Sequence, residues 1–148
     1  MSHNQVMLVT GAAKRIGASI AKKAHAAGYK IVLHYRQSKQ QTQELCQQLN
    51  AIRENSCIIV QADFNQFCDF DMLVEEINQQ FGRLDLLVNN ASDYFETPLL
   101  EFTENEYHKL FNSNVKGALF LSQACYPLLK KSKGCIINLV DVHADKPL

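Results

Sequence analysis

The chain has 148 residues, with 15 Lys and Arg against 15 Asp and Glu, and 47% of its residues are hydrophobic. This is the length and composition of one globular domain, and zero net charge gives no reason to expect nucleic acid or an anionic membrane as a partner. The apolar runs are strand-sized, no secretory signal precedes Val6, and the five cysteines lack metal or disulfide spacing, so we expect a cytoplasmic protein with no metal site and no membrane span.

The first three predicted elements are a strand, a helix and a second strand. An apolar run at 6–9 ends in Gly11, helical spacing follows over 16–27, and a second apolar run occupies 31–35. Gly11 would allow a sharp turn after the first strand, and Gly17 would let the helix lie close to the sheet. The free N–H groups at the start of this helix suit a pyrophosphate, although any strand-to-helix turn can use glycine.

The end of the second strand indicates which dinucleotide would bind. An NAD site usually places an acidic residue about 20 residues beyond the turn, where it binds the ribose 2′-hydroxyl. Here no acid occurs before Glu44, and Arg36 stands where a 2′-phosphate would lie. Arg15 in the turn supplies a second cation, and Ser38 can add a neutral hydrogen bond. The pattern favours NADPH over NADH, the alternative being that both arginines are solvated surface charges.

The rest of the chain continues the alternation. Further helices and strands are predicted, in chain order, at 38–50, 57–60, 71–81, 84–88, 103–129 and 136–140. The long helix begins with a capping box of Thr103 and Glu106, and a break near 112–114 is left open. Near-continuous apolar strands separated by helices favour a parallel sheet covered on both faces. The expected fold is α/β, a doubly wound Rossmann-type sheet of strands one to five within a single dinucleotide-binding domain over 1–148.

In this order and spacing, the residues resemble the short-chain dehydrogenase/reductase family. The resemblance covers essentially the whole chain and rests on the Thr-Gly-x5-Gly turn, Asp63, Asn89-Asn90-Ala91-Ser92, Asn114 and Ile136-Ile137-Asn138-Leu139-Val140-Asp141.

Three departures from the general family are similar to the pteridine reductases. Arg15 replaces a glycine of the turn, the second strand ends in His34-Tyr35-Arg36, and Asp141 replaces a serine. The segment 141–148 also looks like the loop of that subfamily, including its closing Pro-Leu.

The resemblance implies hydride transfer from NADPH to a pterin or dihydropterin, and it assigns roles to individual residues. The implied cofactor-binding residues are Gly11, Arg15, Ile16, Gly17, His34, Tyr35, Arg36, Ser38, Asp63, Phe64, Asn89, Ala91 and Ser92. Asp63 and Phe64 among them would hold the adenine. Asp141 would assist substrate protonation and Asn114 would hold a water, so both are catalytic candidates. Tyr94 would stack on the pterin ring, or else it is a loop residue packed on the protein.

The same resemblance implies a catalytic tyrosine and lysine, four residues apart, on a helix after the fifth strand. Tyr126 and Lys130 have this spacing, but they precede the fifth strand, so topology rejects them. We therefore expect a C-terminally incomplete chain that is inactive as residues 1–148 alone. It would be a fragment of a complete homodimeric or homotetrameric reductase, half of a split enzyme, or a non-enzymatic NADP-binding remnant. A general carbonyl reductase of the 3-oxoacyl type is the alternative activity.

Overall fold

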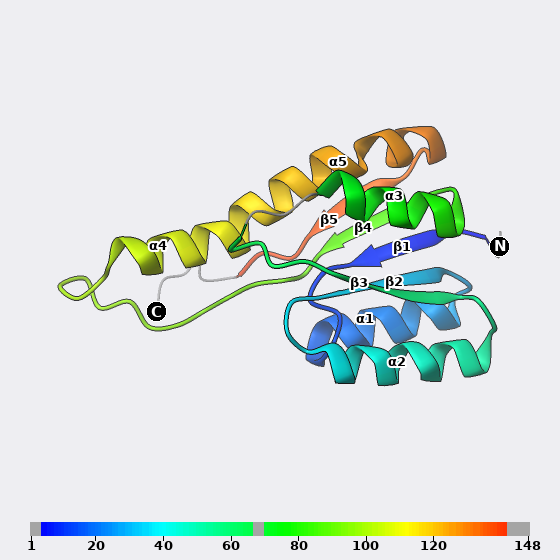
Figure 1. The fold of residues 1–148 in the computed structure, drawn as a ribbon, viewed down its shortest axis with the longest axis horizontal. Helices are drawn as coiled ribbons and strands as arrows, with labels where there is room; N and C mark the ends of the chain where they lie inside the picture. Colours follow the sequence, from blue (N-terminus) through cyan, green and yellow to red (C-terminus); the bar gives the residue numbers. More distant parts are fainter. Residues whose placement is uncertain (1–3, 67–69, 142–148) are drawn as a thin grey trace.

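The computed structural model describes residues 4–66 and 70–141, which form a parallel α/β fold (Figure 1). Its strands are β1 (Val6–Val9), β2 (Lys30–Tyr35), β3 (Cys57–Gln61), β4 (Leu86–Asn89) and β5 (Cys135–Asn138). Its helices are α1 (Arg15–Ala26), α2 (Lys39–Ile52), α3 (Phe70–Phe81), α4 (Glu104–Phe111), the π-helical turn η1 (Asn112–Lys116) and α5 (Gly117–Ser132). Cys68 lies outside the described residues, and so do residues 142–148 of the segment 141–148 that resembles the pteridine reductase loop.

The strand order creates a crevice at one edge of the sheet. The five strands pair in parallel in the order β3-β2-β1-β4-β5. The chain therefore builds outward from β1 through β2 to β3, and then returns to add β4 on the other side of β1. In such sheets the connections diverge at the carboxyl ends of the strands where the order reverses, and ligands bind there. This arrangement confirms the doubly wound Rossmann-type prediction.

Two apolar clusters bury the two faces of the sheet. Val6 and Leu8 of β1 pack toward α3 and α5, whereas Met7 and Val9 point to the opposite face, toward α1 and α2. The two helix pairs lie above and below the sheet in Figure 1. All four residues are fully or almost fully buried, as expected for a central parallel strand covered on both sides.

Several predicted element ends differ by one to three residues from the structure, and two of the differing regions lie near the site. The fifth strand was predicted to reach Val140, but β5 ends at Asn138 because its last paired partner is Asn89 at the end of β4. The open break near 112–114 is the π-helical turn η1, so the helical path continues without interruption from α4 into α5. A π-helical turn holds an extra residue and often marks a functional position.

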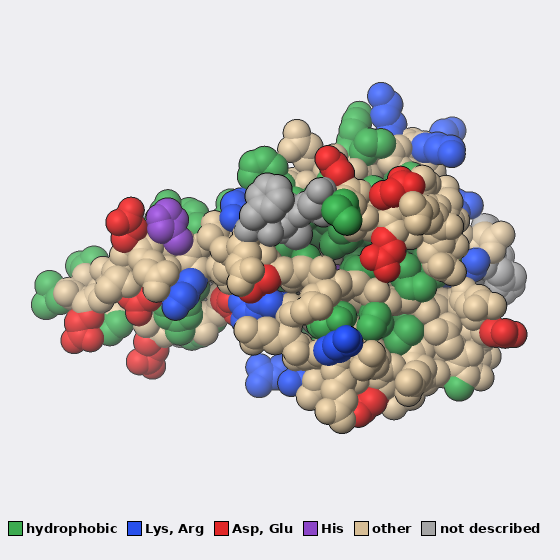
Figure 2. Space-filling view, viewed as in Figure 1, with side chains coloured by type: hydrophobic (Ala, Val, Ile, Leu, Met, Phe, Trp, Pro, Cys, Tyr) green, Lys and Arg blue, Asp and Glu red, His purple; other side chains and the backbone are tan. Residues whose placement is uncertain are grey.

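Helix α4 projects away from the body of the molecule (Figure 1). None of its residues is buried, and hydrophobic side chains lie among acidic ones along this projecting part (Figure 2). The α4 surface, as we call it, comprises Leu99, Leu100, Phe102, Tyr107 and Phe111, all exposed. The Tyr107 and Phe111 rings stack with centroids 4.2 Å apart. Across the described parts of the chain, no helix has both the length and the apolar character needed to cross a membrane.

Candidate functional site

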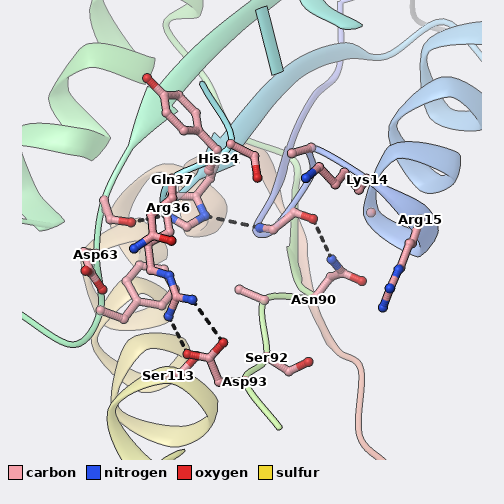
Figure 3. A pocket seen from close by; sticks show the side chains of 18 of the residues that line it. Lys14, Arg15, His34, Arg36, Gln37, Asp63, Asn90, Ser92, Asp93 and Ser113 are labelled. Atoms are coloured by element: carbon pink, nitrogen blue, oxygen red, sulfur yellow. Dashed lines mark hydrogen bonds and ion pairs between the residues drawn. The ribbon is translucent and has the colours of Figure 1, made fainter. Parts of the chain in front are cut away.

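A pocket of about 620 Å³ opens at the carboxyl ends of the central strands (Figure 3). Twelve of the predicted site residues line it, namely Gly11, Arg15, Ile16, Gly17, His34, Tyr35, Arg36, Ser38, Asp63, Phe64, Ala91 and Ser92. They come from the turn after β1, the end of β2, the segment after β3 and the segment after β4. The topology thus brings together residues as distant in the sequence as Gly11 and Ser92, because all these strand ends face the same edge.

The turn after β1 needs glycine at both of its ends. Gly11 has φ +63°, a left-handed conformation that disfavours a side chain. At Gly17 the reason is close packing, because an added Cβ would collide with the carbonyl oxygen of Gly11 and lie 3.0 Å from the Cα of Ala12. Helix α1 therefore starts directly against the turn. No side chain caps its first turn, so its free N–H groups are available to an anion.

Arg15 also has a left-handed backbone, with φ 50°. This conformation is uncommon outside glycine and costs of order 1 kcal/mol for a residue with a Cβ. It accounts physically for the glycine that the resemblance places at this position of the turn. The side chain is exposed at the rim of the pocket, where its charge can reach a bound anion.

Thr10 and Asn90 fasten this turn to the end of β4. The Thr10 hydroxyl oxygen accepts hydrogen bonds from the backbone N–H groups of Asn90 and Ala91, each at 2.9 Å. The Asn90 side-chain amide donates to the carbonyl oxygens of Thr10 at 2.8 Å and Gly11 at 3.2 Å. Neither residue was assigned a role from the sequence. Both residues belong to motifs that carry the family resemblance, the Thr-Gly-x5-Gly turn and Asn89-Asn90-Ala91-Ser92, and these motifs were the available signal.

His34 supports the same turn from beneath. Its Nδ1 accepts the Gly11 N–H at 3.3 Å, and its Nε2 is 3.1 Å from the Ala62 carbonyl, so the proton belongs on Nε2. The ring stacks on Phe64 with centroids 4.8 Å apart and an interplanar angle of 4°. Burial lowers the pKa of His34 to about 4, against the weaker opposing effect of the hydrogen bond to Ala62. A neutral ring is required, because a protonated Nδ1 could not accept from Gly11.

The burial of His34 predicts a specific dependence of stability on pH. The folded pKa of about 4 is below the ordinary value of 6.5, so the unfolded chain binds the extra proton between these pH values. The contribution is complete above pH 6.5 and falls as the pH falls toward 4. We expect His34 to account for a loss of about 2 kcal/mol in unfolding free energy between pH 7 and pH 5.

Urea unfolding of the wild type and of His34→Gln at these two pH values measures this loss as the difference between the two proteins. Burial also lowers the pKa of His25, but that residue is present in both proteins and its effect cancels. As a second measurement on the wild type alone, the ring protons of His34 should not titrate by NMR above pH 5. A midpoint near 6.5 would contradict the prediction.

Phe64 lies mostly in the core. Its side chain is 5% exposed, and its ring is held between His34 and Gly117, where an added Cβ would collide with the ring. Residues 62–65 line the pocket at this point, and the carboxylate of Asp63 accepts the Asn65 N–H at 3.0 Å.

Arg36 contacts an acidic residue, Asp93, that was not predicted from the sequence to lie near it. Its guanidinium forms a two-point ion pair with the Asp93 carboxylate, in which Nη2 donates to Oδ1 at 3.2 Å and Nη1 donates to Oδ2 (Figure 3). The hydrogen bond to Asp93 raises the pKa of Arg36. The sequence prediction rested on the residues that follow β2, where no acid occurs before Glu44, whereas Asp93 reaches Arg36 from the segment after β4.

Four predicted site residues do not line the pocket. Asn114, in η1, accepts the Asp93 N–H and donates to the Asp93 carbonyl, each at 2.9 Å. Tyr94 is 76% exposed, and Asp141 is exposed beyond β5. Asn89 is buried and donates to Ser122 at 3.2 Å and to Asn138 at 2.8 Å, while its Oδ1 has no donor among the residues described.

The sequence is similar over most of its length to known oxidoreductases. The profile of the family described as short chain dehydrogenase matches residues 5–148. The chain is 35% identical to pteridine reductase 1 of Leishmania tarentolae (97% of this chain, 63% of the relative). It is 40% identical to an uncharacterized oxidoreductase of Methylorubrum extorquens (95% and 56%) and 32% identical to a 3-oxoacyl-acyl-carrier-protein reductase of Staphylococcus aureus (96% and 58%). The chain thus spans between 56% and 63% of the length of these three relatives.

Proposed function

Because this chain belongs to the short-chain dehydrogenase family, we propose that it forms the dinucleotide-binding part of an NADPH-dependent reductase. The observation that carries the proposal is the pocket at the switch of strand order, where the glycine-bounded turn, the uncapped start of α1 and two arginines meet. Gly11 lets the turn lie close to the segment after β4, and Gly17 lets α1 begin directly against the turn, so the N–H groups of α1 would face a phosphate group bound there. Bound NADPH would supply the hydride.

The adenosine end of the cofactor would lie between β2 and β3. Asp63 and the backbone beside it would contact the adenine, and Ser38 makes no cap to its own helix, which leaves its hydroxyl for the ribose phosphate. Arg36 and Arg15 would then attract the 2′-phosphate, since guanidinium groups bind phosphate oxygens at two points. Ala91 and Ser92 line the other end of the pocket and would follow the cofactor toward its nicotinamide ribose.

For the substrate we favour a pterin or dihydropterin. The support is the pteridine reductase relative, the aromatic Tyr94 two residues beyond the pocket-lining Ser92, and Asp141 in the place of a serine. Asp141 would hold the proton that the substrate takes up, and Asn114 would position the segment that carries Tyr94 through its two hydrogen bonds to Asp93. The second candidate is a 3-oxoacyl substrate, which the Staphylococcus aureus relative favours.

We also propose that the complete protein is a cytoplasmic homo-oligomer, either a dimer or a tetramer. The α4 surface offers exposed apolar side chains at one end of the molecule, and solvent-exposed apolar patches of this kind mark interaction sites. A second copy of the chain would cover these side chains by the same surface in a symmetric dimer.

Tyr94 separates the two candidate substrates. In the full-length protein, Tyr94→Ala should raise the KM for a dihydropterin about tenfold, because offset stacking of aromatic rings contributes about 0.5–1.5 kcal/mol. The KM for a 3-oxoacyl thioester should change less than about twofold, and Tyr94→Phe should retain the wild-type KM for the pterin, since it keeps the ring. NADPH oxidation with each substrate measures all of these values. Equal effects of Tyr94→Ala on the two substrates would count against a pterin.

A further inference from the structure

The guanidinium of Arg36 is already occupied by a carboxylate of its own chain. The partner, Asp93, is 57 residues away in the sequence and comes from the segment after β4. The two side chains remain 36% and 27% exposed, so a ligand in the pocket can reach both. In the amide orientation that satisfies its neighbours, Asn65 also accepts from Arg36 Nη1 at 3.2 Å and donates to the Lys109 carbonyl at 3.1 Å. Arg36 is therefore held between the segments that follow β3 and β4.

The Asp93 backbone is fixed independently of its side chain. Asn114 binds both its N–H and its carbonyl oxygen, each at 2.9 Å, and so anchors the segment to η1. The carboxylate can therefore leave Arg36 by rotation about its own side-chain bonds, while its backbone stays in place. Another anion could therefore replace the Asp93 carboxylate on Arg36 without any movement of the backbone.

We propose that Asp93 is a specificity-determining residue that competes with the 2′-phosphate of the dinucleotide for Arg36 and so reduces the preference for NADPH. The inference rests on the proposed function, because it concerns the same cofactor. Carboxylate and phosphate use the same two-point geometry on a guanidinium, so one edge of Arg36 binds one of them at a time. An incoming 2′-phosphate must displace Asp93 or lie beside a like charge, whereas a ribose without this phosphate leaves the ion pair intact.

The test compares two nucleotides that differ only in this phosphate, 2′,5′-ADP and 5′-ADP, by isothermal titration of the full-length protein. Asp93→Asn should bind 2′,5′-ADP about tenfold more tightly than the wild type, because it keeps the shape of the side chain and removes its charge. Its affinity for 5′-ADP should change less than about twofold. Asp93→Ser should show the same selective gain, so the result does not depend on one variant.

Two matched variants separate competition at Arg36 from a general effect of charge. Glu96→Gln removes the same charge from an exposed position of the same segment and should leave both affinities unchanged. In an Arg36→Gln background, Asp93→Asn should no longer discriminate between the two nucleotides by more than about twofold, since the shared partner is gone.

The outcomes distinguish this inference from the proposed function. If Asp93→Asn and Asp93→Ser bind 2′,5′-ADP no better than the wild type while 5′-ADP still binds, competition is wrong and NADPH binding stands. Weaker binding of 2′,5′-ADP would show instead that Asp93 orients Arg36 for the phosphate. If no variant, the wild type included, binds either nucleotide, both the proposed cofactor and this inference are wrong.

Discussion

Replacing Gly17 with alanine is expected to lower the free energy of unfolding by about 3 kcal/mol, at the upper end of the usual range for overpacking, and to remove dinucleotide binding. The added Cβ would meet the Gly11 carbonyl oxygen and the Ala12 Cα, which are backbone atoms of the turn itself, and would lie 2.7 Å from the Asn90 amide nitrogen. Two of these contacts are with backbone atoms, which cannot move aside as the end of a flexible side chain could. Helix α1 would have to shift away from the turn that its N–H groups face.

Gly82→Ala is the matched control for this substitution. Gly82 has φ +69°, but the nearest atom to an added Cβ there is 4.0 Å away, so the cost is conformational strain of about 1 kcal/mol without a collision. It lies at the end of α3 and does not line the pocket. Urea unfolding and titration with NADPH measure both effects. If Gly17→Ala loses no more stability than Gly82→Ala, the close packing of α1 against the turn does not make the expected contribution to the free energy of unfolding.

Arg36→Gln in the full-length protein should weaken NADPH binding about 100-fold, which corresponds to about 2.7 kcal/mol, and should leave NADH binding within about threefold. The loss arises because the variant removes the charged donor that would bind the 2′-phosphate at two points. Glutamine is preferred over aspartate here because a second carboxylate would face Asp93. The two dissociation constants, measured by titration, give the change in preference.

Lys39→Gln controls for the loss of one positive charge near the pocket. Lys39 begins helix α2, three residues beyond Arg36, and is exposed without lining the pocket. We expect less than about a threefold effect on either dinucleotide. An unchanged ratio of NADPH to NADH affinity in Arg36→Gln would remove the cofactor assignment, whatever the absolute affinities.

The features that the sequence predicted correctly depend on local patterns. Buried parallel strands are continuous apolar runs, and amphipathic helices repeat every three to four residues, so both could be located without knowledge of their neighbours. The strand-to-helix turn with Gly11 and Gly17 is also local. Because the carboxyl ends of parallel strands share one edge, placing these elements in order was enough to bring Gly11, Arg15 and Arg36 to one pocket.

The features that the sequence did not predict depend on contacts between distant segments. Asp93 neutralises Arg36 across 57 residues, and no spacing rule connects them. His34 is polar and follows the strand pattern, but only the fold shows that its ring is buried against Phe64 and accepts a hydrogen bond from Gly11. His34 and Phe64 both line the pocket, as the sequence assignment requires, but only the structure shows that their rings also stack on each other beneath the turn.

Because the π-helical turn η1 joins α4 to α5 and carries Asn114, the number of residues in this segment determines how α4 and Asn114 are oriented relative to the pocket. An α-helix rotates by about 100° for each residue, so insertion of one more residue within 112–116, beyond the one that the π-helical turn takes up, would turn α4 around its axis by roughly that angle. Asn114 would then leave Asp93, and the Tyr107–Phe111 stack would face another direction. Single substitutions along this helix can be tolerated, but an added residue would change the orientation of α4 relative to the pocket. Relatives that lack the extra residue would need a different way to hold the segment after β4.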